Sequence, residues 1–171
     1  MRSRLSAARA SASEFVGGRV GMQLMQQEQL LQQSQTAFDA YYDALGASLV
    51  NFVERLGIQP AHEVLTNAAE YLPYIDAAMR TIVIRDESWQ WVKTMLGYFI
   101  GEYFVQGHAG CWYVETRAES PHFCRTMVGG FEHGLPLDAA IDPEQLALDF
   151  LAQAVPRELA KLIEDGSVID K

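Results

Sequence analysis

The chain has 171 residues, of which 49% are hydrophobic and 20% charged, and this composition fits one globular domain that needs no disulfide or metal to form a core. Its net charge of −9 argues against a nucleic-acid-binding protein, because such proteins present a basic face, and favours a basic protein partner. Two cysteines and no recognisable export signal favour a reducing compartment, for which we expect the cytoplasm.

The first thirteen residues form a basic segment of small residues. Arg2, Arg4 and Arg9 lie among alanines and serines, and no acidic residue precedes Glu14. The segment lacks the apolar core of a secretory signal. We therefore expect a frayed leader at residues 1–13, followed by a single α+β domain over residues 14–171.

Residues 14–56 contain no proline and are rich in helix-forming residues. They predict one long helix or two stacked helices, and a break would place Thr36 at the cap and Asp39 at the third helical position. Apolar residues recur every seven positions, at Leu24, Leu31, Phe38, Leu45 and Phe52, which we name the Leu24–Phe52 seam. We expect this seam to pack on its own domain. The alternative is a coiled coil between two chains, which would make the protein a homodimer.

Two prolines organise the next part of the chain. Pro60 suits the first position of a helix over residues 61–72, and Pro73 then ends or kinks that helix before a further turn or two at residues 74–79. The β-branched residues 81–84 fit an edge strand or an apolar link, and their periodicity does not separate the two.

The segment that organises the rest of the chain spans residues 88–114. Up to Gly107 it is apolar on every side at helical spacing, which predicts a central buried helix capped by Asp86 or Ser88. One apolar stripe contains Trp91, Met95, Tyr98 and Val105. Lys93 and Glu102 interrupt the apolar run and argue against a membrane-spanning helix.

Four glycines have predicted roles in this segment. Gly97 and Gly101 each cost about 1 kcal/mol against alanine inside a helix, so we expect another backbone to approach closely at these positions. Gly107 and Gly110 are expected to break the helix before a strand at residues 111–116.

The last third of the chain predicts a small sheet followed by helices. Residues 122–128 fit a second strand, antiparallel to the first. Asp142 and the proline after it predict a helix start, and Pro156 predicts the start of a last helix that runs through Ile163 and ends before Gly166. The predicted fold class is α+β and predominantly helical, with N-terminal helices and a central buried helix packed on two or three antiparallel strands, and with C-terminal helices.

Histidines and cysteines gather around the predicted hairpin. His108, Cys111, His122 and Cys124, with His133 further on, are zinc-ligand types, but their spacing is poor for a structural zinc site. They also allow a Cys–His nucleophilic pair, although Cys111 follows a helix C-terminus whose dipole disfavours a thiolate. The alternative to both is that the cysteines are small buried hydrophobic residues, so no cofactor is expected.

Glu102 is the one acidic residue on the apolar stripe. A partly buried carboxylate has a raised pKa unless it is paired, which makes Glu102 a candidate general acid. The structural alternative is a pair with Arg117, Arg125 or a backbone amide. Together with Trp112 and Tyr113, Glu102 is also a candidate for binding a partner, because aromatic residues favour interface cores.

Two runs, Leu96-Gly-Tyr-Phe-Ile-Gly-Glu-Tyr-Phe and Gly110-Cys-Trp-Tyr-Val, resemble a pattern of small uncharacterised bacterial proteins. Matching positions are Gly97, Gly101, Glu102, Gly110 and Trp112, within residues 95–136. Some proteins with this pattern look like immunity or accessory proteins of toxin systems, so the resemblance implies a neutralising role without catalysis.

These observations lead to one functional hypothesis and two alternatives. We expect a non-enzymatic cytoplasmic binding protein with a basic protein partner, acting as a toxin neutraliser, and neither nucleic acid nor membrane as a partner. The first alternative is a small enzyme or zinc protein that uses Glu102 or the Cys/His group. The second is a homodimeric structural module joined through the Leu24–Phe52 seam.

Overall fold

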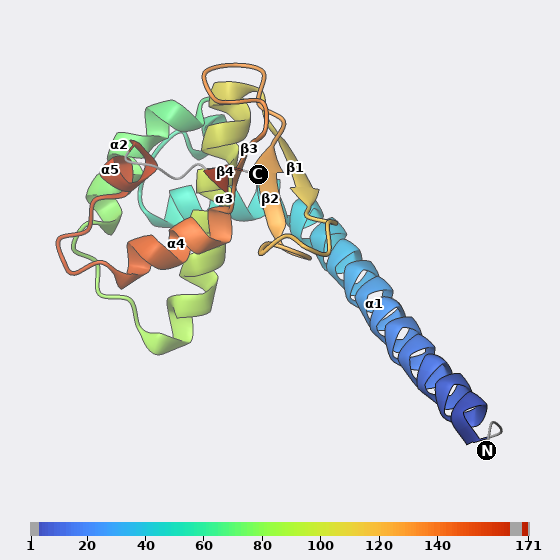
Figure 1. The fold of residues 1–171 in the computed structure, drawn as a ribbon. Coiled ribbons are helices and arrows are strands. Elements are labelled where there is room, and N and C mark those ends of the chain that lie inside the picture. Colours follow the sequence, from blue (N-terminus) through green and yellow to red (C-terminus); the bar gives the residue numbers. More distant parts are fainter. Residues whose placement is uncertain (1–3, 165–168, 171) are drawn as a thin grey trace.

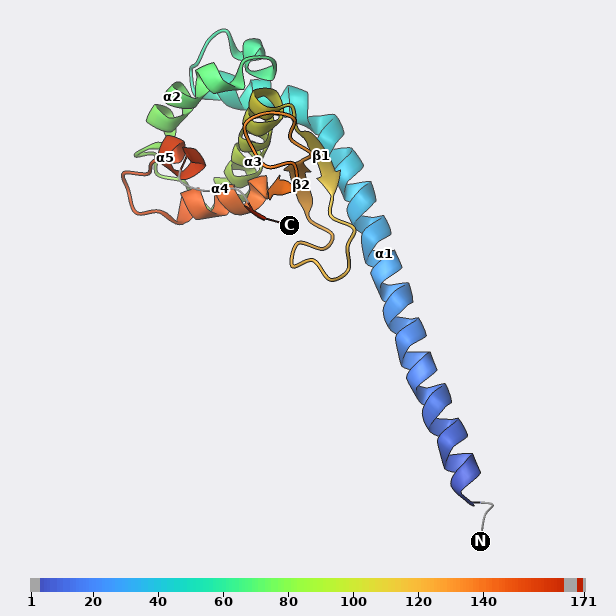
Figure 2. The same cartoon turned by 45° about the horizontal axis from the view of Figure 1, so that its top comes forward.

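The computed structural model describes the backbone of residues 4–164 and 169–170, and the side chains of residues 21–164. The fold is predominantly helical α+β, as predicted, with helices packed on a small antiparallel sheet. A long helix, α1 (Arg4–Arg55), runs past this body, and its N-terminal half extends away from it (Figures 1 and 2). No helix of the described residues is long and apolar enough to cross a membrane.

Helix α1 is continuous, which decides between the one-helix and two-helix predictions. Thr36 does not cap a second helix, because its hydroxyl donates to the carbonyl of Gln32 one turn earlier, at 3.0 Å. Residues 4–13, for which a frayed leader was expected, form the first turns of α1, and residues 1–3 lie outside the described part.

The Leu24–Phe52 seam divides into a buried and an exposed part. Leu45 and Phe52 belong to the hydrophobic core, together with Leu49 one turn from each. Leu24, in the projecting part, is 55% exposed. The seam therefore packs on its own domain only where α1 passes the body (Figure 1).

The predicted helix over residues 61–72 is instead two elements. A 3₁₀ helix, η1 (Ala61–Leu65), is followed by α2 (Ala68–Met79). Pro73 lies inside α2 and does not end it, although a proline at this position lacks the N–H that would bond to the carbonyl of Ala69. Residues 81–84 form no strand, and Val83 is 87% exposed, so this segment is a link.

The central helix is α3 (Asp86–His108), and two of its predicted details are wrong. Its cap is Arg85, without a side-chain hydrogen bond, rather than Asp86 or Ser88. Trp91 is 38% exposed, because the first turns lie at the edge of the body, where its ring packs on Phe52 and under the guanidinium of Arg55. From Val92 onward most of the helix is buried.

Helix α3 also ends later than predicted. Gly107 stays helical, and the helix terminates at Ala109 in the left-handed conformation, with φ 51°. Strand β1 (Cys111–Val114) follows and pairs antiparallel with β2 (Thr126–Gly129), so that Trp112 lies opposite Val128. The second strand begins at Thr126 rather than His122, because the chain turns at Cys124 with φ 66°.

Two further strands complete the sheet in the order β1-β2-β3-β4. They are β3 (Ala139–Ile141) and β4 (Ile169–Asp170), both too short for a periodic signal. Helix α4 (Pro143–Ala152) begins as predicted, since Asp142 accepts a hydrogen bond from the amide of Gln145 at 2.9 Å. Helix α5 (Leu159–Glu164) starts three residues after Pro156, and Gly166 lies outside the described residues.

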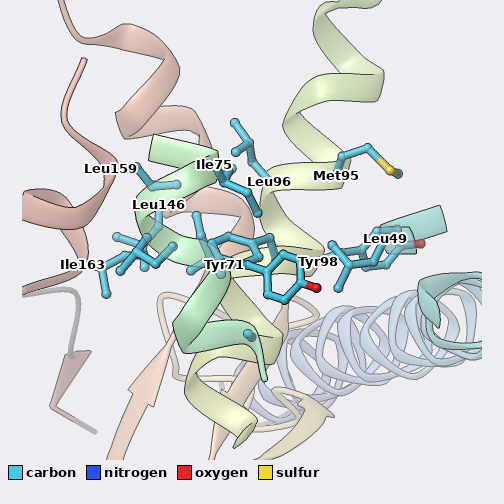
Figure 3. Packing of buried hydrophobic residues seen from close by; sticks show 14 of the residues in the cluster. Leu49, Tyr71, Ile75, Met95, Leu96, Tyr98, Leu146, Leu159 and Ile163 are labelled. Atoms are coloured by element: carbon cyan, nitrogen blue, oxygen red, sulfur yellow. The ribbon is translucent and has the colours of Figure 1, made fainter. Parts of the chain in front are cut away.

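The core lies between α3 and the elements that surround it. Figure 3 shows core side chains from α1, α2, α3, α4 and α5, including Leu49, Ile75, Leu96, Leu146 and Leu159. All except Leu146 are fully buried. This core fixes the positions of the surface clefts described next.

Candidate binding site

Glu102 takes part in a structural hydrogen-bond network and is not a free acid. One carboxylate oxygen accepts from the indole nitrogen of Trp112 at 2.9 Å, and the other accepts from the side-chain amide of Gln106 at 3.2 Å. The expected arginine partners are engaged elsewhere, Arg117 with Glu115 and Arg125 with Asp142. The predicted pairing of Glu102 with an arginine is therefore wrong.

Gln106 extends this network to the η1–α2 region. Its side-chain oxygen accepts from the amide of Ala68 at 2.7 Å, and its nitrogen donates to the carbonyl of Val64 at 3.1 Å. Glu102 thus orients a residue that joins α3 to η1 and α2, while also holding the indole of β1. The contacts of this carboxylate are those of a structural residue.

Gly101 allows Trp112 to lie against α3. A Cβ at position 101 would stand 2.0 Å from two carbons of the indole ring. We expected a backbone to approach here, and the structure instead places an aromatic side chain. At Gly97 a Cβ would have the hydroxyl oxygen of Tyr41 at 3.5 Å and the Cα of Glu144 at 3.8 Å, which are ordinary van der Waals contacts, so the structure shows no close backbone approach there.

The histidines and cysteines do not form a metal-binding group. His108 Nδ1 lies 2.9 Å from the carbonyl of His133, and the thiol of Cys111 donates to the carbonyl of Gly129 at 3.5 Å. His122 instead lies on the Asp142 side, 3.7 Å from that carboxylate. Within residues 21–164, no three His, Cys, Asp or Glu side chains are placed to hold a metal ion.

A first cleft lies where α1 leaves the body, and we call it the helix-root cleft. It measures about 170 Å³ and is lined by Ser34, Ala37, Phe38, Tyr41, Trp112, Cys124, Thr126, Pro143 and Glu144. It brings the predicted binding residue Trp112 within 5.8 Å of Tyr41, ring centre to ring centre. Tyr113 is not among its lining residues, because neighbouring residues of a strand face opposite sides of the sheet.

The polar groups of the helix-root cleft are largely satisfied within the chain. Glu144 forms an ion pair with Lys93 at 2.5 Å. Burial, and then the nearby Tyr98, Glu144, Asp142 and Glu102, raise the pKa of Tyr41, so its hydroxyl stays neutral. The cleft is therefore an aromatic hollow without an unpaired charge to attract an ionic ligand.

A second cleft lies between the end of α1 and helix α2, and we call it the acidic cleft. It measures about 400 Å³ and is lined by Gly57, Ile58, Gln59, Pro60, Glu63, Glu70, Tyr71 and Tyr74. Its lining residues include two carboxylates and no basic side chain. Tyr74 is 62% exposed, so its ring is open to a partner.

Tyr71 connects the two sides of the acidic cleft. Its hydroxyl donates to the carbonyl of Pro60. Burial, followed by the charges of Glu63 and Glu70, raises the pKa of Tyr71.

The two glutamates of the acidic cleft were not predicted as binding residues from the sequence. Glu63 lies in η1 and Glu70 in α2, and the cleft that they line is completed by residues 57–60 after α1, which no local sequence pattern places there. No family model, curated protein or solved structure matches this chain.

Proposed function

We propose that this protein is a non-enzymatic binding protein with a basic protein partner, and that the acidic cleft receives a lysine or arginine side chain of that partner. The observation that carries the proposal is the joint presence of Glu63, Glu70 and the exposed ring of Tyr74 around one cleft without a basic lining residue. A cation is the ligand that these three groups favour together.

The energetics of such a contact are favourable. A cation over an aromatic ring contributes roughly 0.5–1 kcal/mol at an exposed site and about 2 kcal/mol when water is excluded. The two carboxylates add charge-assisted hydrogen bonds to the same cation. An arginine can stack on the aromatic ring and donate hydrogen bonds to both carboxylates at once, because its guanidinium is planar and carries five donors.

The charge of the remaining surface supports the same kind of partner. Residues 21–171 contain 21 acidic and nine basic residues, a net charge of −12. A field of this sign accelerates the encounter with a basic protein, and the effect weakens with salt. The helix-root cleft is the less suitable site for a cation, because its Glu144 is already paired with Lys93.

We further propose that binding neutralises a bacterial toxin in the cytoplasm. The resemblance of residues 95–136 to immunity-like proteins supports this role. Both cysteines are free thiols, which supports a reducing compartment. An immunity protein acts by occupying its toxin, so it needs a surface of complementary charge rather than a catalytic group.

The first experiment compares capture of partners by the native protein and by cleft variants. The tagged protein is expressed in its own host and purified at low salt, and bound proteins are identified by mass spectrometry. We expect one basic protein to be retained by the native chain and by the control Glu132→Gln, and lost with Glu63→Gln/Glu70→Gln and with Tyr74→Ala. An unchanged partner affinity in both cleft variants would overturn the proposal.

The second experiment tests neutralisation itself. The captured partner is produced in a surrogate cell with and without this protein. We expect growth arrest by the partner alone, rescue by the native chain and by Glu132→Gln, and no rescue by the cleft variants. If the partner binds but does not impair growth, the proposed binding function stands and the proposed neutralising function is contradicted.

A further inference from the structure

The projecting half of α1 exposes apolar residues that pack on nothing in the described chain. Met22, Leu24, Met25 and Leu30 are each more than half exposed, at 54%, 55%, 66% and 52%. Ser34 is the first residue of α1 among those that line the helix-root cleft. The helix therefore extends by about 30 residues, or roughly 45 Å at 1.5 Å per residue, beyond the body (Figures 1 and 2).

We propose that this projecting half pairs with the same segment of a second copy, running in the antiparallel direction. The proposal is independent of the acidic cleft, which opens at the other end of α1, next to Gly57. Three features of α1 support this pairing: the continuity of the apolar seam, the distribution of charge, and the distribution of side-chain size.

The apolar seam of the projecting half continues the seam that already packs on the body. Leu24 and Leu31 precede Phe38, Leu45 and Phe52 at the same seven-residue spacing. Leu45 and Phe52 are buried against their own domain, whereas Leu24 has no such cover. Seven-residue apolar spacing in a long helix is typical of helix pairing, so a second helix is the occupant that the pattern fits.

The charges along α1 are segregated, and this selects the orientation. Residues 4–20 contain three arginines and one glutamate, whereas residues 21–54 contain four acidic residues and no basic one. A parallel pair would place like charges side by side. An antiparallel pair places the basic part of each helix along the acidic part of the other, which lowers the electrostatic energy.

Side-chain size is segregated in the same direction. Residues 6–18 consist mostly of alanine, serine and glycine, whereas residues 22–31 contain two methionines and three leucines. Antiparallel pairing with the two-fold axis near Val20 and Gly21 aligns the large residues of each copy with the small residues of the other. In the same register, Arg4 lies opposite a position within one turn of Asp39 of the other copy. Arg9 lies opposite a position within one turn of Glu28.

This register also ends the helix pair where the body begins. Residue 4 of one copy is level with residue 36 of the other, next to the helix-root cleft. The overlap therefore uses the whole projecting half and leaves the two bodies at opposite ends of the pair. A dimer of this form presents two acidic cleft sites, one from each copy, for partners with repeated basic surfaces.

Distance measurement between spin labels tests the orientation directly. In a Cys111→Ser/Cys124→Ser background, a single label at Gln32→Cys is expected to give a distance of roughly 35 Å in the antiparallel pair, from 24 residues at 1.5 Å each. A parallel pair would give a short distance of about one helix-pair spacing, roughly 10 Å. A short distance, or no defined distance at tens of micromolar protein, would overturn the proposal.

Substitutions test the seam and the charges by sedimentation. Leu24→Glu/Leu31→Glu is expected to give a folded monomer, whereas Leu137→Glu, at an exposed leucine of the body, stays dimeric. Arg4→Glu/Arg9→Glu is expected to weaken the dimer at least tenfold, and the added changes Glu28→Arg/Asp39→Arg to restore it. A monomeric native chain would contradict the antiparallel pair. So would a charge-swapped variant that does not regain the affinity of the native dimer. Circular dichroism checks that each variant is folded.

Discussion

The carboxylate of Asp76 on α2 accepts a hydrogen bond from the backbone amide of Leu159, 83 residues later, at 2.6 Å. The same oxygen accepts from the amide of Ala160 at 3.3 Å, and the other oxygen forms an ion pair with Arg80 at 2.5 Å. Asp76 is 5% exposed. One buried side chain thus supplies the N-terminal cap of α5 and fastens it to α2.

This relationship predicts a pH dependence of stability. Burial by itself raises the pKa of Asp76, but hydrogen bonds from Arg80 and from the amides of Ala160 and Leu159 outweigh it and hold the pKa below its usual value. A carboxyl with a depressed pKa in the folded state contributes stability that is complete above its unfolded pKa of about 3.9. This stability is lost as the pH falls through the lower folded value.

Asp76→Asn removes that contribution. The difference in unfolding free energy between the native chain and the variant is expected to be constant above about pH 5 and to shrink below about pH 4. Urea denaturation at stepped pH measures it, with Asp138→Asn, at an exposed carboxylate, as the control. A difference that persists unchanged to about pH 2.5 would contradict this account.

Gly101 and Gly107 form a matched pair of glycines on α3. Gly101→Ala places a Cβ 2.0 Å from the ring of Trp112, so we expect a loss of roughly 1–3 kcal/mol in unfolding free energy. Gly107→Ala meets nothing within 4 Å, so helix propensity predicts a gain of up to about 1 kcal/mol. Chemical denaturation distinguishes the two signs.

The clash can be separated from other effects by shortening the ring. Trp112→Phe lacks the outer ring carbons that a Cβ at position 101 would meet, so Gly101→Ala is expected to cost less in that background than in the native one. Equal costs in both backgrounds would show that contact with Trp112 is not what requires glycine.

Asp142 is expected to be the most sensitive carboxylate of the C-terminal half. It is 1% exposed, caps α4 through the amide of Gln145 and pairs with Arg125 at 2.6 Å. Asp142→Ala removes both contacts and is predicted to cost about 2–4 kcal/mol, whereas Asp142→Asn keeps the capping oxygen and costs less. Thermal denaturation compares the stability of the two variants. An equal loss of stability in both would show that the negative charge, and not the capping oxygen, accounts for the whole effect.

Cys124 occupies the left-handed region with φ 66°, which disfavours any residue with a Cβ. Cys124→Gly is therefore predicted to be more stable than Cys124→Ala by about 0.5–1 kcal/mol, although glycine loses more backbone entropy. Ala118, in the preceding turn, is the control, because its φ is not positive. There we expect the opposite order, with alanine more stable than the variant Ala118→Gly. The same order at both sites would rule out backbone strain as the reason.

The elements that the sequence predicted well are those with local signals. Helix α4 was located from Asp142 and the proline after it, because capping chemistry acts within one turn. The central helix was recognised from its apolar residues, yet Trp91 is partly exposed, because periodicity reports which residues are apolar but not where the body ends. Strands β3 and β4 are too short to carry a period, so only their pairing partners define them.

The sequence by itself determined the predominantly helical α+β fold class, and it singled out Gly101, Glu102 and Trp112, because these follow from propensity, spacing and residue type. That the N-terminal region is one continuous helix was decided only by the structure. Only the tertiary structure decided that Glu102 is bonded to Trp112 and Gln106, and that Glu63 and Glu70 share one cleft with Tyr74. The physical reason is that a carboxylate's role depends on which donors surround it and on how much water remains. Both are set by tertiary packing, which can join residues far apart in sequence, as where Asp76 caps a helix that begins 83 residues later.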